Sequence, residues 1–349
     1  MDWKYINQDA KLVAEGNIDW NKLQNKKVLV VGATGYVPQY FVHGLLMHND
    51  LFQTNIKVIA FCRNAQKAEE RFGRYYGRAD FQLQIGDVRE PMVCQEDVDY
   101  IINAASPAGV KASLEDPITT YNVNILGNKN CLELAVRKHA KYLFISSVDV
   151  YGNMENTERL EEFKLGTIDI LNVRTVYACA KRAAESLCAC YANAGMDCKI
   201  VRPSQIMGGG IALDDGRLHI DFISQMLKGD SIVLKGDGTP KRTFIYVTDA
   251  ILGMLTVLLE GKSGEAYNVC SETGEATVLE LAKIMSGGIK NRRIDIEFNM
   301  ETRMTDPGVK QVVSCVCGSS QKLRELGWEP QISLEESAKK MMRYYGLEV

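Results

Sequence analysis

The sequence has almost no excess of charge of either sign. It carries 41 Lys and Arg residues against 44 Asp and Glu residues, which gives a formal net charge of −3. A nearly neutral chain has no general electrostatic attraction for nucleic acid or for an anionic membrane surface. Long apolar runs are also missing, because stretches such as "AILGMLTVLL" at 250–259 are too short to span a bilayer. We therefore expect neither nucleic acid nor a membrane as a partner.

Signals for export and for metal binding are absent as well. The start, "MDWKYINQDAKL", has no basic segment followed by an apolar one, as a secretory signal would have. Ten cysteines are scattered along the chain, and no paired C-x-x-C units have the spacing of a zinc site. These absences predict a cytoplasmic protein with reduced thiols and no bound metal.

What the sequence does contain is a regular alternation of strand-like and helix-like segments. Runs rich in valine, isoleucine and leucine alternate with segments whose apolar residues recur every three to four positions. This order predicts a Rossmann-like, doubly wound α/β fold, with a parallel sheet that is covered by helices on both faces. The strand-like runs lie at 26–33, 56–62, 81–87, 98–105, 141–148 and 198–206.

The sequence pattern changes after about residue 200, where glycine-rich loops and shorter strand-like runs predict a smaller α+β region. We therefore divide the chain into three parts. These are an N-terminal extension (1–25) with Trp3 and Trp20 as anchors, a doubly wound domain (26–200), and a smaller α+β region (201–349) partly interleaved with that domain.

A glycine turn, "VVGATGYVPQ", follows the first strand and precedes a helix. In a dinucleotide site the first glycine allows the sharp turn, and the second removes a side chain where the backbone meets the pyrophosphate. Gly32 and Gly35 occupy these positions, and Pro38 stands where a third glycine is usual. Proline is tolerated in the first turn of a helix, where a missing N–H breaks no helical hydrogen bond. Glycines at this spacing are weak evidence alone, but the strand before and the helix after them favour a cofactor site.

The choice between NAD and NADP is usually made at the end of the second strand. NAD sites place an acid there for the ribose hydroxyls, whereas NADP sites place an arginine for the 2′-phosphate. This chain has "FCRN", so Arg63 favours NADP, with a solvated arginine as the alternative. Asp87, after the third strand, is placed to accept from the adenine amino group, with a plain turn aspartate as the alternative.

Three further residues form a catalytic pattern. "YACAK" places Tyr177 and Lys181 one helical turn apart, and an ammonium group beside a phenol is expected to lower the phenol pKa. Tyr177 could then remove or return a hydroxyl proton. Ser147, at the end of the preceding strand, can hydrogen-bond the same substrate oxygen.

Together these segments resemble the extended short-chain dehydrogenase/reductases that modify nucleotide sugars. "GATGYV" is similar to the glycine turn of that family, "NAAS" to its fourth-strand end, "NILGNKNCLELA" to its N-x-x-G helix, and "SSVDVYG" and "YACAK" to its catalytic strand and helix. The likeness runs from about residue 26 to 345. "RTVYACAKRAAE", "DDGRLHIDFI" and "AASP" are most similar to the branch of UDP-glucuronate decarboxylases and dTDP-glucose 4,6-dehydratases.

The resemblance implies roles for individual residues. Catalytic roles fall on Ser147, Asp149, Tyr177 and Lys181. Cofactor contacts are implied for Gly32, Thr34, Gly35, Tyr36, Val37, Arg63, Asp87, Val88, Ala104, Ala105, Asn124, Tyr177 and Lys181. Substrate contacts are implied for Ser106, Ser147, Gln205, Arg217 and Arg242.

The chain departs from the family pattern at three places. Pro38 replaces the third glycine, Gln205 replaces an asparagine that contacts the sugar nucleotide, and Val148 and Asp149 stand where the family has T-D-E or T-S-E. Only one acid is left after Ser147, and it is one carbon shorter than glutamate.

The resemblance implies an enzyme that transiently oxidises the C4 hydroxyl of a nucleotide sugar with a tightly bound, recycled NAD or NADP. The single acid favours a UDP-glucuronate decarboxylase-like or 4-epimerase reaction over 4,6-dehydration, which remains the alternative. A simple carbonyl reductase and, from another class, a non-catalytic dinucleotide-sensing protein are further alternatives. The resemblance also implies a homodimer whose four-helix bundle is formed by residues 124–139 and the helix carrying 177–195 of each subunit.

Overall fold

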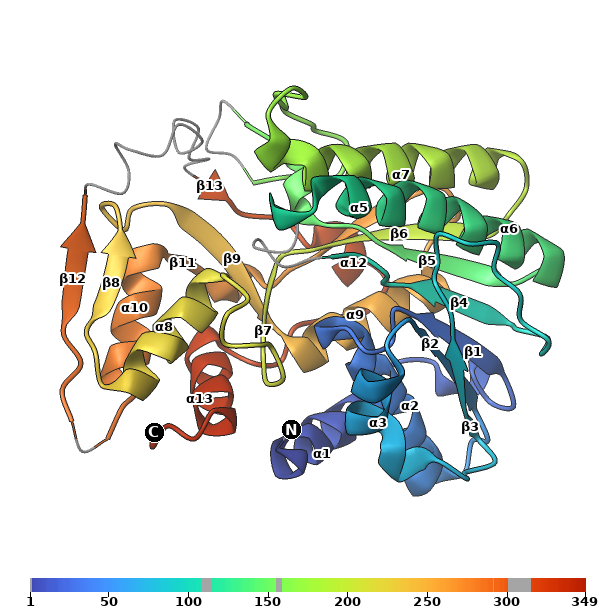
Figure 1. The fold of residues 1–349 in the computed structure, drawn as a ribbon, viewed down its shortest axis with the longest axis horizontal. Coiled ribbons are helices and arrows are strands. Elements are labelled where there is room, and N and C mark those ends of the chain that lie inside the picture. Colours follow the sequence, from blue (N-terminus) through green and yellow to red (C-terminus); the bar gives the residue numbers. More distant parts are fainter. Residues whose placement is uncertain (1, 108–113, 155–158, 291, 301–314) are drawn as a thin grey trace.

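The structure is a computed structural model, and it describes residues 2–107, 114–154, 159–290, 292–300 and 315–349. Its centre is a sheet of seven strands in the order β10-β6-β5-β4-β1-β2-β3, and all neighbouring strands are parallel (Figure 1). The predicted doubly wound α/β fold is therefore confirmed. The strands are β1 (Lys27–Val31), β2 (Lys57–Cys62), β3 (Phe81–Ile85), β4 (Tyr100–Asn103), β5 (Lys141–Ile145), β6 (Cys198–Pro203) and β10 (Ala266–Val269).

Helices cover both faces of this sheet (Figure 1). One face carries α1 (Trp3–Ala14), α2 (Tyr36–Phe52), α3 (Ala65–Phe72) and α9 (Val247–Glu260). The other face carries α5 (Pro117–Asn122), α6 (Asn128–Lys138) and α7 (Val176–Asn193). Helix α5 continues into α6 through a π-helical turn at Val123–Gly127, so the helix predicted over 124–139 exists but is not uniform.

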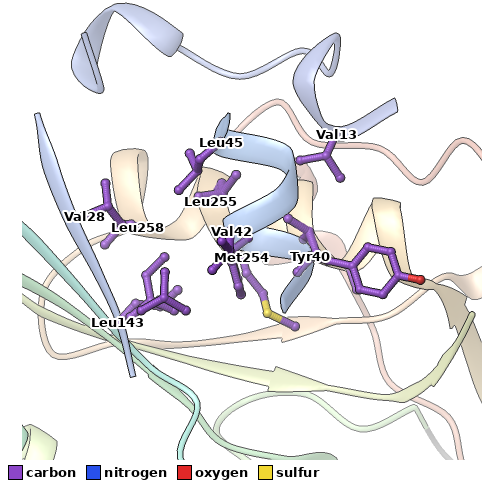
Figure 2. Packing of buried hydrophobic residues seen from close by; sticks show 14 of the residues in the cluster. Val13, Val28, Tyr40, Val42, Leu45, Leu143, Met254, Leu255 and Leu258 are labelled. Atoms are coloured by element: carbon purple, nitrogen blue, oxygen red, sulfur yellow. The ribbon is translucent and has the colours of Figure 1, made fainter. Parts of the chain in front are cut away.

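Strand β1 shows why the apolar runs are continuous. Val28 and Val30 pack in the cluster beneath α1, α2 and α9, whereas Leu29 and Val31 pack in the cluster beneath α6 and α7. All four side chains are fully buried, because successive side chains of a strand point to opposite faces and both faces are covered. Figure 2 shows the first of these clusters, and Val28 of β1 and Leu258 of α9 are among its labelled members.

A second lobe follows β6. The strand predicted over 198–206 is wrong as a single element, because the chain leaves the large sheet after Ser204, whose N–H donates to the carbonyl of Val269 (3.0 Å). Gln205 then pairs with Phe244 in another sheet. The strands of this lobe are β7 (Gln205–Met207), β8 (Ile232–Lys235), β9 (Lys241–Tyr246), β11 (Glu275–Thr277), β12 (Ile296–Asn299) and β13 (Cys315–Val316). Its helices are α8 (Leu218–Lys228), α10 (Val278–Gly287) and α13 (Leu334–Tyr344), whereas the short helix α12 (Gln321–Arg324) packs against β10 and α9 at the large sheet.

The N-terminal segment is ordered and packs across α2. Asp2 caps α1 by accepting from the N–H of Lys4 (3.0 Å), and the ring of Trp20 stacks on His48 at 3.6 Å between centroids. Gly44 of α2 faces Val13 of α1 so closely that a Cβ at this glycine would overlap the valine side chain. The close approach of α1 and α2 therefore depends on Gly44.

Gly44→Ala is expected to destabilise the protein by about 1–3 kcal/mol, because the added methyl group forces α1 away from α2. Gly287→Ala is the matched control, since a Cβ at Gly287, in the last turn of α10, meets no atom within 4 Å. Urea denaturation measures both variants, and equal stabilities would contradict the role given to Gly44.

Candidate active site

A cavity of about 840 Å³ opens where the carboxyl ends of the strands meet the second lobe. Its wall combines the first turn of α2, the end of β5, the start of α7, the β6–β7 junction and the loop before α8. Predicted site residues in this wall are Gly35, Tyr36, Val37, Ala104, Ser106, Ser147, Asp149, Tyr177, Lys181, Gln205 and Arg217. The structure thus places all four predicted catalytic side chains around one space.

Ser147 links the strand end to the carboxylate of Asp149. It follows β5 and caps the short helical turn Val148–Tyr151, where its Oγ accepts from the N–H of Asp149 (3.1 Å). The same hydroxyl donates to Oδ2 of Asp149 (3.1 Å) and also hydrogen-bonds Tyr177. The turn therefore fixes serine, carboxylate and phenol as one cluster.

Lys181 is buried on α7, with 2% of its surface exposed. Its Nζ donates to the carbonyl of Ile145 (2.7 Å) and lies 4.6 Å from the ring centroid of Phe144 and 5.7 Å from that of Tyr177. Burial lowers its pKa to about 7, and the negative charge of Glu185 opposes this shift. The ammonium group is thus easier to deprotonate than that of an exposed lysine.

The phenol of Tyr177 behaves differently from the sequence prediction. Burial raises its pKa, as does the charge of Asp149, while the hydrogen bond with Ser147 and the charge of Arg217 act in the other direction. The prediction that Lys181 lowers this pKa is therefore wrong for the structure described here. The physical reason is that the ammonium group donates to the Ile145 carbonyl and lies over the ring rather than beside the phenol oxygen.

Asp149 is exposed to the cavity, and the cavity itself is enclosed by protein that partly desolvates the carboxyl group. This environment raises the pKa of its carboxyl group, while Ser147, Arg242 and Arg217 lower it. A carboxyl with a raised pKa can hold a proton nearer to neutral pH than an exposed aspartate can.

A buried ion pair stands behind Lys181. Nε and Nη2 of Arg202 donate to the two carboxylate oxygens of Glu185 (3.0 and 2.7 Å), and Nη1 donates to the hydroxyl of Tyr151 (3.1 Å). Tyr151 in turn donates to Oδ1 of Asn268 (2.7 Å). The charge that faces Lys181 is therefore part of a network that reaches β10.

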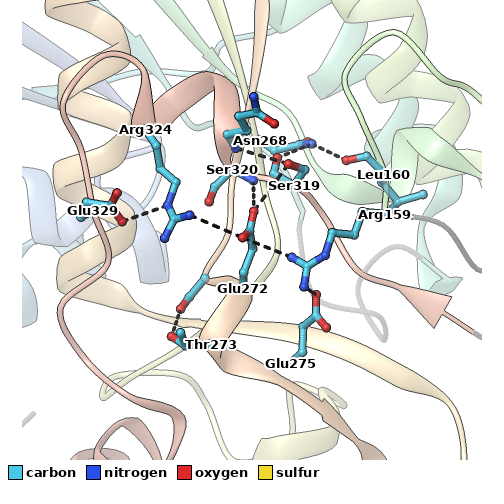
Figure 3. A network of polar contacts seen from close by, with 12 residues as sticks. Arg159, Leu160, Asn268, Glu272, Thr273, Glu275, Ser319, Ser320, Arg324 and Glu329 are labelled. Carbon is cyan, nitrogen blue, oxygen red and sulfur yellow. Dashed lines mark hydrogen bonds and ion pairs between the residues drawn. The ribbon is translucent and has the colours of Figure 1, made fainter.

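Figure 3 shows the outer part of this network. Asn268 donates to the carbonyls of Leu160 and Ser319 (2.9 and 3.1 Å), and the carboxylate of Glu272 accepts from the N–H of Ser320 (3.0 Å). Arg159 adds an ion pair to Glu272 at 3.4 Å. These bonds join the end of β10 to two segments that are distant in sequence.

The glycine turn fits a dinucleotide diphosphate. Gly32 has φ +76°, and a Cβ there would lie 2.8 Å from Cα of Ala105. Gly35 caps α2 without a side chain, so the N–H groups of the first turn point toward the cavity without a side-chain acceptor. Pro38 is buried in this first turn, as expected, and a Cβ at Gly35 would lie 2.9 Å from its Cγ.

Three buried hydroxyl groups support the same fit. Oγ atoms of Ser106, Ser146 and Ser204 line the cavity region and have no hydrogen-bond partner in the described structure. Buried polar groups are normally hydrogen-bonded, so these hydroxyls indicate that a polar ligand belongs in the cavity.

Other predicted residues do not line the cavity. Their environments differ: Val88 and Ala105 are core residues, Asn124 donates to the carbonyl of Thr120 (2.8 Å), and Thr34 hydrogen-bonds Cys62. The predicted site residues that do not line the cavity are Gly32, Thr34, Arg63, Asp87, Val88, Ala105, Asn124 and Arg242.

Asp87 and Arg63 lie at the strand ends as predicted, but with other partners. Arg89 forms a two-point ion pair with Asp87, with contacts of 3.0 and 2.6 Å, and lowers the pKa of this carboxyl to about 2. Arg63 is exposed. The carboxylate of Asp87 accepts from Arg89 in this structure, and its contact with the adenine amino group stays a prediction.

The cavity wall also contains residues that sequence reasoning missed. Trp3 comes from α1, Lys67, Glu70 and Arg71 come from α3, and Tyr344 and Tyr345 come from the end of α13. A signal was present for α3, because Lys67 and Arg71 are four residues apart on this helix. No local pattern marks Trp3 or the two tyrosines, which reach the cavity only through the packing of distant helices.

Two general features accompany this site. The nine cysteines whose side chains the structure describes are all free thiols. Among the described residues, no helix combines the length and the apolar character that crossing a bilayer requires.

The sequence pattern of the NAD dependent epimerase/dehydratase family matches residues 28–270. The chain belongs to this family. A relative, UDP-glucuronic acid decarboxylase 2 of Arabidopsis thaliana, is 31% identical over 324 residues, which are 92% of this chain and 68% of the relative. UDP-glucuronic acid decarboxylase 1 of Danio rerio is 29% identical over 93% of this chain and 73% of its own length.

Solved structures of the epimerase/dehydratase type share the fold. dTDP-glucose 4,6-dehydratase of Bacillus anthracis, in complex with NAD, has a TM-score of 0.74 at 22% identity and covers 92% of this chain and 96% of its own. UDP-glucose 4-epimerase of Thermotoga maritima, with UDP-glucose, also has a TM-score of 0.74 at 22% identity, over 91% and 98% of the two chains. At this level of identity the likeness establishes the architecture.

Glu185→Gln is expected to destabilise the protein by about 3–5 kcal/mol, because it leaves the Arg202 guanidinium buried without a countercharge. Glu133→Gln is the control: it breaks an exposed pair with Lys129 on α6 and should change stability by less than about 1 kcal/mol. Urea denaturation compares the two, and a small effect of Glu185→Gln would show that the buried pair is not needed.

Proposed function

We propose that this family member modifies a nucleotide-diphosphate sugar through transient oxidation of the sugar C4 hydroxyl, most closely in the manner of a UDP-glucuronate decarboxylase or a 4-epimerase. The observation that carries this proposal is the cluster of Ser147, Asp149, Tyr177 and Lys181 on one cavity wall. The likeness to UDP-glucuronic acid decarboxylases over most of the chain supports the same assignment.

NAD or NADP, when bound, would accept hydride from the sugar and return it, so that it is recycled and remains tightly bound. The residues that would hold its diphosphate are the first turn of α2, at Gly35, Tyr36 and Val37, with Tyr177 and Lys181 at the reactive end. These residues fit the group, because the turn presents N–H donors without a capping side chain.

Tyr177 is the proton acceptor in this proposal. Its phenol and the hydroxyl of Ser147 are hydrogen-bonded, so both can contact the same substrate oxygen at C4. Because burial raises the phenol pKa, a positive charge must approach the phenol before it can ionise near neutral pH. Arg217 already lowers the phenol pKa through its charge, and Lys181, whose protonated form Glu185 favours, lies 5.7 Å from the ring centroid of Tyr177.

The acid content of the strand end decides which reaction follows. A ketone at C4 acidifies C5, and from there a carboxylate leaves as carbon dioxide without the help of a base. Loss of water across C5 and C6 needs both an acid and a base, yet Asp149 is the only carboxylate that this turn offers, because its neighbour Val148 is apolar and buried. The turn therefore favours decarboxylation or epimerisation, and 4,6-dehydration is the second candidate.

Substrate contacts are proposed on the side of the second lobe. Arg217 lines the cavity, is paired with Asp215 at 3.2 Å, and lies 6.0 Å from the ring centroid of Tyr36. Gln205 lines the same wall, at the start of β7. Arg242 does not line the cavity, but its positive charge acts on Asp149, and we propose that Arg242 and Arg217 favour the diphosphate of the substrate.

For the cofactor we propose NADP rather than NAD, since Arg63 follows β2 and no acid stands there. The exposed position of this arginine leaves it accessible to a 2′-phosphate.

Incubation of the purified protein with UDP-glucuronate and with UDP-, dTDP-, GDP- and CDP-hexoses, followed by chromatographic separation of epimers and mass detection, tests the function. Loss of carbon dioxide or an epimerised product of unchanged mass is expected, whereas a 4-keto-6-deoxy product would favour dehydration. A protein that changes none of these sugars, and reduces no bound dinucleotide in their presence, would match the sensor alternative.

Tyr177→Phe should lower turnover by about 10²–10⁴-fold while the dinucleotide still binds, because only the proton-transferring hydroxyl is removed. The measurement is the rate of product formation beside a dinucleotide titration of the same variant. A variant that keeps more than about a tenth of the wild-type rate contradicts the role of the phenol.

A homodimer is proposed through the outer faces of α5, α6 and α7. A groove of about 440 Å³ lies between α5, the start of α7 and the preceding loop, and its wall is mostly apolar. Ile118 and Leu171 in this wall are 74% and 91% exposed. Ala184 and Cys188 of α7 are buried within the subunit, so the outward face of α7 is the one available to a second copy.

Light scattering at micromolar concentration should give the mass of a dimer, since burial of this apolar surface favours association. Leu171→Glu should shift the mass to that of a monomer, and Leu165→Glu, an exposed leucine outside the groove, is the control. A wild-type monomer, or a dimer unaffected by Leu171→Glu, would contradict this interface.

A further inference from the structure

Helix α1 brings the side chain of Trp3 into the wall of the candidate active site. The family pattern begins at residue 28, so this helix lies outside it. Trp3 is half-buried and lines the same cavity as the first turn of α2. It belongs neither to the catalytic cluster nor to the glycine turn, and the reaction proposed above gives it no task.

The protein holds the indole ring of Trp3 from two sides. His43 of α2 makes an edge-to-face contact with it at 5.5 Å between ring centroids. The guanidinium of Arg74, which follows α3, lies over the indole at 4.6 Å from the ring centroid. Nη1 of Arg74 also donates to Oδ1 of Asn7, one turn further along α1 (2.9 Å). These contacts fix the orientation of the ring and still leave part of its surface open to the cavity.

Further contacts connect α1 with other elements of the cavity wall. The backbone of Asp2 hydrogen-bonds the hydroxyl of Tyr344, at the end of α13. The ring of Tyr344 lies so close to Gly209 that a Cβ at this glycine would overlap it. The carbonyl of the next residue, Gly210, accepts from Nη2 of Arg71 on α3 (3.3 Å). Contacts therefore run from α1 through the end of α13 and these two glycines to α3.

This part of the wall lies beside the turn that would hold a diphosphate. A Cβ at Gly210 would lie 2.9 Å from Nε2 of Gln39, and Gln39 donates to the carbonyl of Tyr36 in the first turn of α2 (3.0 Å). A dinucleotide with its diphosphate at this turn would therefore be enclosed by protein on this side. The members of this wall that line the cavity are Trp3, Arg71, Gly210 and Tyr344.

We propose that Trp3 is a binding residue for the dinucleotide, and that α1 retains the recycled cofactor by closing this side of the cavity. The inference rests on the function proposed above, in which the cofactor stays bound between turnovers. An indole ring offers a large apolar contact area and carries no charge that would have to be desolvated. Arg74 is exposed, and cation–π contacts at exposed positions are weak, so this part of the wall can open when the dinucleotide exchanges.

The test measures how fast a dinucleotide leaves the protein. The protein is loaded with NADH or NADPH, an excess of the oxidised dinucleotide is added, and the loss of fluorescence of the bound reduced form gives the dissociation rate. The variants are Trp3→Ala, Trp3→Phe and Arg74→Ala. Trp20→Ala is the matched control, because Trp20 belongs to the same N-terminal segment but stacks on His48 and does not line the cavity.

Trp3→Ala should raise the dissociation rate about tenfold, since the loss of one aromatic contact from a binding site has an effect of this order. Trp3→Phe should restore most of the wild-type retention. Arg74→Ala should raise the rate about threefold although Arg74 does not line the cavity, because it acts only through the position of Trp3. Trp20→Ala should lower the stability of the protein and leave the dissociation rate unchanged.

Different results overturn different statements. If Trp3→Ala releases the dinucleotide at the wild-type rate, or if Trp20→Ala raises the rate equally, α1 has only a structural role and the inference is wrong. If Trp3→Ala instead weakens the binding of UDP, measured by isothermal titration, the ring contacts the substrate and not the cofactor, which also overturns the inference. If the wild type binds neither NADH nor NADPH, the proposed function itself fails.

Discussion

The charge on Lys181 is the constraint on which the rest of the site depends. An ammonium group with almost no exposure is costly unless a carbonyl, an aromatic face and an opposite charge surround it. Ile145 and Phe144 at the end of β5 supply the first two, and Glu185, one turn further along α7, supplies the third. Glu185 is itself buried and requires Arg202.

This requirement spreads through the fold. The guanidinium of Arg202 also donates to Tyr151, and Tyr151 donates to Asn268 on the edge strand β10. One buried cation is thus supported by polar groups on β5, α7, β6 and β10. Because a half-satisfied buried network is worse than an apolar core, these elements must be assembled together or the site does not form.

Much of this arrangement could be predicted from the sequence, because parallel strands buried on both faces leave continuous apolar runs. The turn at Gly32 and the Tyr177–Lys181 spacing were likewise visible, since local geometry alone places them at the carboxyl edge of the sheet. The break between β6 and β7 at Ser204 could not be predicted. Pro203 and Gln205 lie in strands of two different sheets, and an apolar run does not show which strand it will pair with.

The effect of Lys181 on the pKa of Tyr177 could not be predicted from the sequence either. A lysine four residues after a tyrosine shares its side of a helix, but where the ammonium points depends on the nearest acceptor. Here that acceptor is the carbonyl of Ile145, which a sequence pattern cannot identify. Likewise, the row of cations on α3 was legible in the spacing of Lys67 and Arg71, but only the packed structure places it beside the cavity.

Segments from the two ends of the chain meet at the rim of this cavity. Trp3 and Tyr344 line it, the rings of Tyr5 and Tyr344 are in contact, and Lys340 pairs with Asp9 at 3.4 Å across 331 positions of sequence. Contacts of such long separation are among the last to form, because nearly the whole chain must be ordered first. A ligand that binds only the finished cavity therefore stabilises the docking of α1 and α13 by mass action, and protection of the N-terminal helix from proteolysis becomes a measure of whether the cavity is filled.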